Sequence, residues 1–197
     1  MIRTGAEYLE SIRDGREVWI DGERVKDMST HPAFKPIIDV RARMYDMAHE
    51  ALYQEQLTYQ DEETGELNTT YHKPPRTRED WYEKDVALDA LMNDIGGVVI
   101  RISDESVGEM WSLFDGKDVL NEADPQFATN IEQHILRTTR EDPFHVSANT
   151  DPKGDRSKPP QEQDPDMLLH VVKETDAGII VRGAKYETAA AYSNQAF

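Results

Sequence analysis

The stretch that decides the fold covers residues 142–192. It reads DPFHVSANTDPKGDRSKPP at 142–160 and LLHVVKETDAGIIVRGAKYETAAAY at 168–192. Apolar and β-branched runs separated by Gly, Pro and Asp predict a strand, a long polar loop and two further strands, at residues 144–148, 149–165, 167–173 and 178–182. Packing of a hydrophobic core does not require the polar sequence Asp-Pro-Lys-Gly-Asp-Arg at this position. We therefore expect the loop to hold a polar ligand against a sheet.

The residues before this stretch carry mainly helical patterns. Helices are predicted from Thr4 to Gly15, over 36–52, from Thr77, over 105–114 after Asp104, and from Asp124-Pro125 onward. Short hairpins are predicted at 18–25, around Asp21-Gly22, and at 56–71. The apolar spacing predicts two buried helical faces, formed by Trp81, Leu88, Leu91, Met92 and Ile95, and by Phe127, Ile131, Ile135 and Leu136.

A helical first part followed by a β second part predicts an α+β fold. The expected division is a mainly helical N-terminal domain with short hairpins at residues 1–142, and a β domain that begins at residues 143–197. Residues 178–181 are apolar and β-prone, and residues 189–197 stop without a capping element or a polar tail. We therefore expect the chain to be the front part of a longer protein.

Composition limits the classes of function. The chain has 197 residues, with 22 Lys and Arg against 39 Asp and Glu, and a formal net charge of −17. This balance argues against nucleic acid and against an anionic membrane surface as partners. The absence of cysteine excludes disulfides, Cys-ligated zinc, iron–sulfur clusters and a thiol nucleophile. It fits a cytoplasmic protein, and the sequence shows neither a signal-peptide core nor an apolar run long enough to span a membrane.

Histidine is the first residue type to consider for chemistry. The six histidines show no metal-binding spacing; they are His31, His49, His72, His134, His145 and His170. His145 lies in the strand that enters the polar loop, where it is either an interior histidine or part of a site. Motifs of the G-x-S-x-G, G-x-G-x-x-G and P-loop types are missing, so no metal and no usual nucleotide cradle are expected.

Two arginines have alternative interpretations. Arg101 follows the apolar run 96–100 and is either a structural ion or an anchor for a substrate anion. Arg156 either orders its loop through Asp155 or presents a cation to a cofactor. Asp151 and Asp155 are more typical of loop turns than of metal or glycosidase chemistry.

Three segments resemble one enzyme family. They are the opening MIRTGAEYLESIRDGREVWIDGERVKDMSTHPAF at 1–34, the loop DPKGDRSKPP, and KETDAGIIVRGAK. They are similar to the large oxygenase component of 4-hydroxyphenylacetate 3-monooxygenase and its chlorophenol monooxygenase relatives, and the similarity extends over most of the chain. The resemblance implies an acyl-CoA-dehydrogenase-like fold, with a helical N-terminal domain, a central β-barrel and a C-terminal four-helix bundle that is absent here.

The resemblance also implies a reaction. Family members are commonly homotetramers that receive reduced FAD from a separate flavin reductase. Oxygen adds to the flavin as a C4a-hydroperoxide, which hydroxylates a phenol ortho to its oxygen. A branch with the same fold acts as acyl-CoA dehydratases and isomerases and uses an iron–sulfur cluster, which this chain has no cysteines to ligate. A third alternative is an inactive truncated fragment or an interaction module.

Site residues follow from the same resemblance. Arg101 matches the family's substrate-binding and catalytic Arg, whereas Glu105 stands where the family has Tyr. The family His, nine residues before the loop Arg, corresponds to Ser147, and His145 is two residues away. The implied flavin contacts are Ser147, Ala148, Asn149, Lys153, Gly154, Asp155 and Arg156, with a later one at or beside Thr188.

Overall fold

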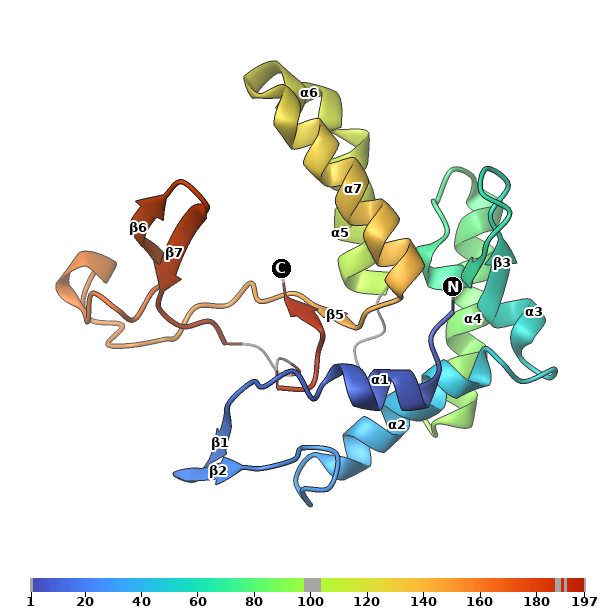
Figure 1. Cartoon of the computed structure of the whole chain (residues 1–197), viewed down its shortest axis with the longest axis horizontal. Helices are drawn as coiled ribbons and strands as arrows, with labels where there is room; N and C mark the ends of the chain where they lie inside the picture. Colours follow the sequence, from blue (N-terminus) through green and yellow to red (C-terminus); the bar gives the residue numbers. More distant parts are fainter. Residues whose placement is uncertain (1, 98–103, 187–188, 190, 197) are drawn as a thin grey trace.

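The computed structural model describes residues 2–97, 104–186, 189 and 191–196, and it combines helices with short strands, as an α+β fold does (Figure 1). The helices are α1 (Gly5–Ser11), α2 (Lys35–Met47), α3 (Gln54–Leu57), α4 (Arg78–Asp94), α5 (Asp104–Asp115), α6 (Lys117–Ala123) and α7 (Pro125–Glu141). The strands are β1 (Val18–Ile20), β2 (Glu23–Val25), β3 (Thr58–Gln60), β4 (Leu67–Thr69), β5 (His145–Val146), β6 (His170–Thr175), β7 (Gly178–Arg182) and β8 (Gln195–Ala196). Single 3₁₀ turns are η1 (Thr70–His72) and η2 (Pro160–Glu162).

Capping residues begin the helices where the sequence predicts. Thr4 and Glu7 form a reciprocal capping box on α1. The Asp124 side chain accepts the Gln126 N–H (2.8 Å), with Pro125 in the first turn of α7. Helix ends are predicted less well, since α1 ends at Ser11 and α2 at Met47.

Strands pair in separate two-stranded ladders within the described residues. β1–β2, β3–β4 and β6–β7 are antiparallel hairpins, whereas β5 and β8 are parallel, with His145 opposite Gln195. Asp21 and Gly22 turn the first hairpin with φ of 49° and 82°, the left-handed pair that a tight hairpin favours. The β5–β8 pair brings residues 195–196 back beside the strand that opens the polar loop (Figure 1).

The expected helical faces are partly wrong. On α4 the buried residues are Asp80, Lys84, Ala87 and Leu91, whereas Trp81 is 50% exposed and Leu88 41% exposed. Lys84 lies inside because its ammonium group donates to the Tyr71 carbonyl oxygen (2.5 Å). On α7, Ile135 is buried and Ile131 half-buried, but Phe127 and Leu136 are exposed.

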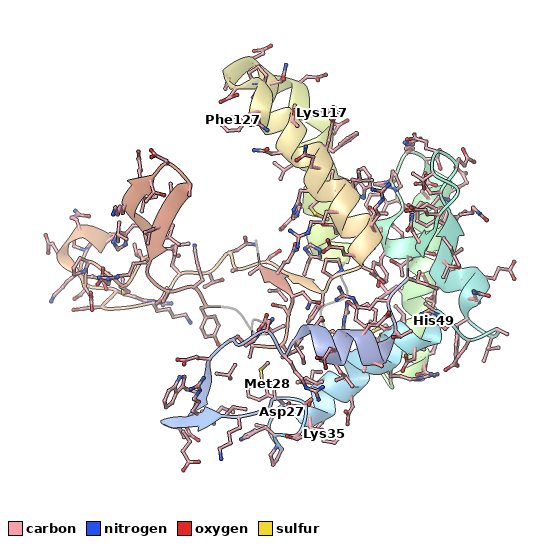
Figure 2. The ribbon with its side chains drawn as sticks, viewed as in Figure 1. Asp27, Met28, Lys35, His49, Lys117 and Phe127 are labelled. Atoms are coloured by element: carbon pink, nitrogen blue, oxygen red, sulfur yellow. The ribbon has the colours of Figure 1, made fainter. Side chains whose placement is uncertain are left out.

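Helices α5, α6 and α7 form an arm that extends away from α1 and α2 (Figure 1). Met110 and Ile135 form its small core, joined by half-buried Trp111 and Phe114. Lys117 lies at the outer end of the arm (Figure 2), where its ammonium group is 4.1 Å from the Phe114 ring centre. An arm of this kind buries little apolar surface. Phe127 and Leu136 are therefore exposed, although their helical spacing predicted that they would be buried.

The principal core lies around α1 and α2. It joins Tyr8, Ile38 and Tyr45 to Phe144 and Val146, so the β5 segment packs against the first helices. Met28, beside the start of α2, is buried in this same core (Figure 2). A second apolar cluster holds α2, α3 and α4 together. Among the helices described, none combines the length and the apolar character needed to cross a bilayer.

A buried carboxylate, that of Asp142, lies where the helices and β5 meet. Its Oδ1 accepts hydrogen bonds from the Tyr71 hydroxyl (2.9 Å) and from His72 Nε2 (3.0 Å). Its Oδ2 accepts the Arg3 backbone N–H (3.3 Å), and the Tyr45 hydroxyl donates to its carbonyl oxygen (3.0 Å). Asp142 therefore joins the N-terminal segment, α2, η1 and the end of α7.

The charge on this carboxylate is stabilised by its neighbours. Burial raises the pKa of Asp142, but the hydrogen bond and charge of His72 and the Tyr71 hydroxyl outweigh burial, so the pKa lies below its ordinary value of 3.8. A folded pKa below the unfolded one stabilises the fold above the unfolded value. That stabilisation is lost as the pH falls through the folded pKa.

Replacing Asp142 by Ala is expected to lower the free energy of unfolding by about 3 kcal/mol, because His72 and Tyr71 keep buried polar groups without their acceptor. Urea titration at pH 7 measures this change, and the difference from wild type should shrink as the pH falls below about 4. Asp89→Ala, on the exposed side of α4, is the matched control and should cost less than about 0.5 kcal/mol. Equal losses in the two variants would contradict the account.

Candidate functional site

The chain leaves the Asp142 cluster through β5, which carries His145. The His145 side chain is buried, with its ring centre 6.2 Å from that of His134 in an edge-on arrangement. Burial, and then the neighbouring positive charges of His72, His134 and Arg41, lower the pKa of His145 to about 3. His145 is therefore interior and neutral at physiological pH, and its place in a binding site stays a prediction.

Arg41, on α2, is a buried cation that the sequence did not single out. Its guanidinium carbon lies 4.0 Å from the Phe144 ring centre and 5.0 Å from that of Tyr45. Stacking on two aromatic faces lets a guanidinium remain charged in the interior. It places a positive charge directly behind β5. The helical spacing of α2 gave no signal for this, because Arg41 looks like an ordinary polar position.

Ser147 ends the buried part of this strand and meets α5. Its hydroxyl donates to Glu109 Oε2 (2.9 Å), and Glu109 itself is exposed. Glu105 belongs to the first turn of the same helix, but its side chain is outside the described residues, as are Arg101 and Thr188. Glu109 was missed because nothing in its local sequence separates it from an ordinary exposed helical position.

The polar loop begins where burial stops. Ala148 is half-buried, and the remaining predicted contacts are exposed: Asn149, Lys153, Gly154, Asp155 and Arg156. Gly154 has a φ of +49°, and a Cβ placed on it would lie 2.1 Å from Gln163 Oε1 and 2.5 Å from Met167 Sδ. The position thus requires glycine both for its backbone angle and for lack of space.

Asp155 orders the loop without Arg156, which corrects one of the two interpretations of Arg156. Asp155 Oδ1 accepts the Ser157 backbone N–H (3.0 Å) and hydroxyl (2.7 Å), and Lys158 lies 3.7 Å away. These bonds, that of the Ser157 side chain first, lower the pKa of Asp155. Within residues 104–186, Arg156 forms no ion pair or side-chain hydrogen bond, so its cation is available to a ligand.

Gln163 closes the loop and was not anticipated. Its Oε1 accepts the Asp155 backbone N–H (2.7 Å), and its Nε2 donates to the Lys158 carbonyl oxygen (3.2 Å). A single amide side chain thus connects both sides of the turn. The predicted position of the loop is confirmed, but its internal clamp depends on a contact eight residues away that local patterns do not encode.

The start of the loop is tied to the segment after β7. Asp151 pairs with Lys185 (2.7 Å), and the Tyr186 N–H donates to the Thr150 carbonyl oxygen (2.8 Å). Asp151 is therefore a structural partner. In the described part of the chain, no three His, Asp or Glu side chains come close enough together to hold a metal ion.

A separate hollow lies between the β3–β4 turn and helices α5 and α7. Its rim carries the ion pairs Arg76–Glu63 (3.2 Å) and Arg140–Glu66 (3.6 Å), and its floor includes Trp111. It contains neither Ser147 nor the polar loop. We assign the candidate site to residues 147–156, which run from the contact of β5 with α5 into the polar loop and contain the buried hydroxyl of Ser147, the glycine at positive φ and the available cation of Arg156.

Comparison with known proteins identifies the family. Residues 4–197 match the family model described as 4-hydroxyphenylacetate 3-hydroxylase N terminal, so the chain belongs to that family. The 4-hydroxyphenylacetate 3-monooxygenase oxygenase component of Thermus thermophilus is 33% identical over 94% of this chain and 38% of its own length. The chain thus spans about two fifths of that relative.

Solved structures show the same fold. A 4-hydroxyphenylacetate 3-monooxygenase oxygenase component complexed with FAD and 4-hydroxyphenylacetate aligns with a TM-score of 0.85 and 32% identity, over 97% of this chain and 39% of that one. An archaeal 4-hydroxybutyryl-CoA dehydratase from N. maritimus aligns with a TM-score of 0.82 and 28% identity, over 98% and 39%. The recognition of the family from sequence is confirmed.

Replacing Gly154 by Ala should loosen the loop, because the new Cβ displaces Gln163 from the Asp155 N–H. Amide hydrogen exchange at Asp155 is expected to accelerate about tenfold, with a small loss of stability near 1 kcal/mol. Gly65→Ala is the control, since Gly65 also has a positive φ (69°) but no atom within 4 Å of the added Cβ. Unchanged exchange at Asp155 in Gly154→Ala would refute the clamp.

Proposed function

We propose that this chain is the N-terminal part of the oxygenase component of a two-component aromatic hydroxylase, which uses reduced FAD and oxygen to hydroxylate a phenol ortho to its oxygen. The observation that carries the proposal is the similarity, over 97% of the chain, to an oxygenase component solved with FAD and 4-hydroxyphenylacetate. The junction of β5, α5 and the loop supports it.

The residues at this junction fit a flavin. Gly154 lets the backbone approach a planar ring or a phosphate, and Arg156 supplies a cation that no described side chain neutralises. In the proposal, residues 147–149 and 153–156 hold FAD, with Thr188 as a later contact. When bound, reduced flavin would activate molecular oxygen so that one oxygen atom can be transferred to an electron-rich aromatic ring.

Protein groups on the substrate side orient the phenol. The proposal assigns Arg101 to the phenolic oxygen, where a guanidinium favours the electron-rich phenolate. Ser147, Glu105 and the α5 surface form the adjacent wall. His145, neutral and buried, supports this wall from behind and takes no part in proton transfer near neutral pH.

The proposed architecture is that of the acyl-CoA-dehydrogenase-like enzymes. Residues 1–142 form the helical N-terminal domain, and residues 143–197 form the first part of a central β-barrel domain. For the whole protein, we propose a C-terminal four-helix bundle, assembly as a homotetramer, and a separate flavin reductase as partner.

A second candidate function is acyl-CoA dehydration or isomerisation, which the similarity to the archaeal dehydratase favours. The iron–sulfur cluster that the resemblance assigns to that branch needs cysteine ligands, and this chain contains none. We therefore place the hydroxylase first. An inactive fragment is the third candidate, and stoichiometric FAD binding by the 197-residue chain would argue against it.

The direct test supplies the full-length protein with a flavin reductase, FAD and oxygen, and measures hydroxylated products from a panel of para-substituted phenols. We expect ortho-hydroxylation with consumption of one oxygen molecule per product. Flavin oxidation without any hydroxylated phenol, together with turnover of an acyl-CoA, would replace the proposal by the second candidate.

Arg156→Ala should weaken FAD binding about tenfold, because it removes a charge-assisted contact worth roughly 1.5 kcal/mol. Fluorescence titration of the full-length protein measures the dissociation constant. Arg137→Ala is the control, since Arg137 is an exposed arginine on α7 paired only with Glu141 among the described residues. If both substitutions change the dissociation constant of FAD equally, Arg156 does not contact the cofactor.

A further inference from the structure

The opening segment of the chain contacts the last residues that the structure describes. Four of its side chains, which we call the N-terminal contacts, form hydrogen bonds with residues 191–194: Arg3, Tyr8, Ser11 and Arg16. The bonded residues are at least 175 positions apart in sequence, and they meet where α1 lies beside the segment that leads into β8 (Figure 1). This opening is also the longest of the three segments that resemble the family, and none of its residues belongs to the candidate site.

Arg16 forms the central bonds of this set. Its Nη1 donates to the carbonyl oxygens of Ala191 (3.1 Å) and Ser193 (2.5 Å). Its Nε and Nη2 donate to the two carboxylate oxygens of Asp14 (2.8 and 2.5 Å), and such a bidentate pair fixes the plane of a guanidinium. The hydrogen bond from Arg16 lowers the pKa of Asp14 to about 2, so the pair is ionised at neutral pH.

Tyr8 holds the carbonyl group between these two. Its hydroxyl donates to the Tyr192 carbonyl oxygen (2.9 Å), and the Tyr8 side chain is fully buried in the principal core. The Tyr192 ring packs on that of Phe144, with 5.8 Å between the ring centres. Residues 191–193 thus direct three successive carbonyl groups at Tyr8 and Arg16.

Asn194 connects the N-terminal contacts to β5. Its Oδ1 accepts the Phe144 backbone N–H (2.9 Å), and its own N–H donates to the Phe144 carbonyl oxygen (2.8 Å). Its side chain is oriented by Arg3 Nη1, which donates to Oδ1 (2.8 Å), and by Ser11 Oγ, which accepts from Nδ2 (2.8 Å). Phe144 comes three residues before Ser147, so the placement of residues 147–149 depends on this connection.

The ladder between β5 and β8 is short. Within the described residues it pairs His145 with Gln195 and Val146 with Ala196. Even a complete two-stranded hairpin is marginally stable in water, and a parallel pair of two residues is weaker still. The N-terminal contacts therefore supply the order that the ladder alone does not.

We propose that Arg16, oriented by Asp14, is a positioning residue for the cofactor site: it holds residues 191–194, which fix β5 and thereby keep residues 147–149 in the conformation that binds FAD. This inference rests on the proposed function, because it concerns the same site. Arg16 acts without touching the flavin. A binding segment that is already ordered loses less conformational entropy when its ligand binds, which raises the affinity.

The test uses the full-length protein and measures the FAD dissociation constant by fluorescence titration. Arg16→Gln should weaken FAD binding about tenfold, because it removes both carbonyl contacts and the pair with Asp14. Without FAD, amide hydrogen exchange over residues 144–149 should accelerate about tenfold. At saturating FAD, kcat for phenol hydroxylation should return to within about twofold of wild type, since the bound flavin then orders the segment.

Two conservative variants keep the test decisive if Arg16→Gln does not fold. Arg16→Lys keeps the charge and one carbonyl contact, and Tyr8→Phe removes only the bond to Tyr192. Each should weaken FAD binding about threefold, between wild type and Arg16→Gln.

Arg43→Gln is the matched control. Arg43, on α2, also pairs with two carboxylates, those of Glu50 and Asp94, and none of its contacts within the described residues involves β5 or residues 191–194. Its FAD dissociation constant should stay within about twofold of wild type, and its exchange over residues 144–149 should be unchanged.

Three results would overturn the inference: unchanged FAD affinity in Arg16→Gln, or in both conservative variants, or an equal loss of affinity in Arg43→Gln. In each of these the wild type still binds FAD, so the proposed function stands and only the role of Arg16 falls. Failure of the wild type to bind FAD counts against the proposed function, and the inference falls with it.

Discussion

The buried carboxylate of Asp142 is the constraint on which the rest of this structure depends. A charge taken out of water must be surrounded by donors, and here the donors come from segments far apart in sequence: Arg3, Tyr71 and His72. Asp142 also adopts a left-handed conformation, with φ of 47°, where α7 ends. These requirements together fix where the chain leaves the helices and in which direction β5 begins.

The site follows from that direction. Phe144 and Val146 fill the core beside α1 and α2, Arg41 stacks on Phe144, and His145 is buried behind the same strand. Ser147 is the last buried residue before the polar loop, and its hydroxyl donates to Glu109 where the chain enters that loop. The rigid part of the fold thus delivers one hydroxyl to α5, while the loop that follows is held by Gln163 and Lys185.

Local signals predicted the parts of the structure that depend on neighbouring residues. The capping box of Thr4, the Asp21-Gly22 turn and the polar loop with Gly154 were all readable, because capping, positive φ and turn chemistry act within a few residues. The family was recognised from such segments as well. The buried faces of α4 and α7 were partly wrong, because packing partners distant in sequence decide which side of a helix is covered.

Long-range polar contacts explain what the sequence left out. Arg41, Gln163 and Glu109 each have partners at least eight residues away, and each looks like an ordinary polar position in its own segment. The sequence did not show that His145 is buried near other positively charged groups, which lower its pKa, and its site role stays a prediction. The role of Arg101 comes from the family resemblance, and it remains a proposal because Arg101 lies outside the described residues.

The most direct measurement is a crystal structure of the full-length protein with FAD and a phenol bound. We predict that the flavin contacts the segment around Gly154 and Arg156, and that the phenol lies between it and the α5 surface carrying Glu109, within reach of Ser147. Density for the flavin and phenol at the hollow between the β3–β4 turn and α7, with the Gly154 loop free of contacts, would contradict this account.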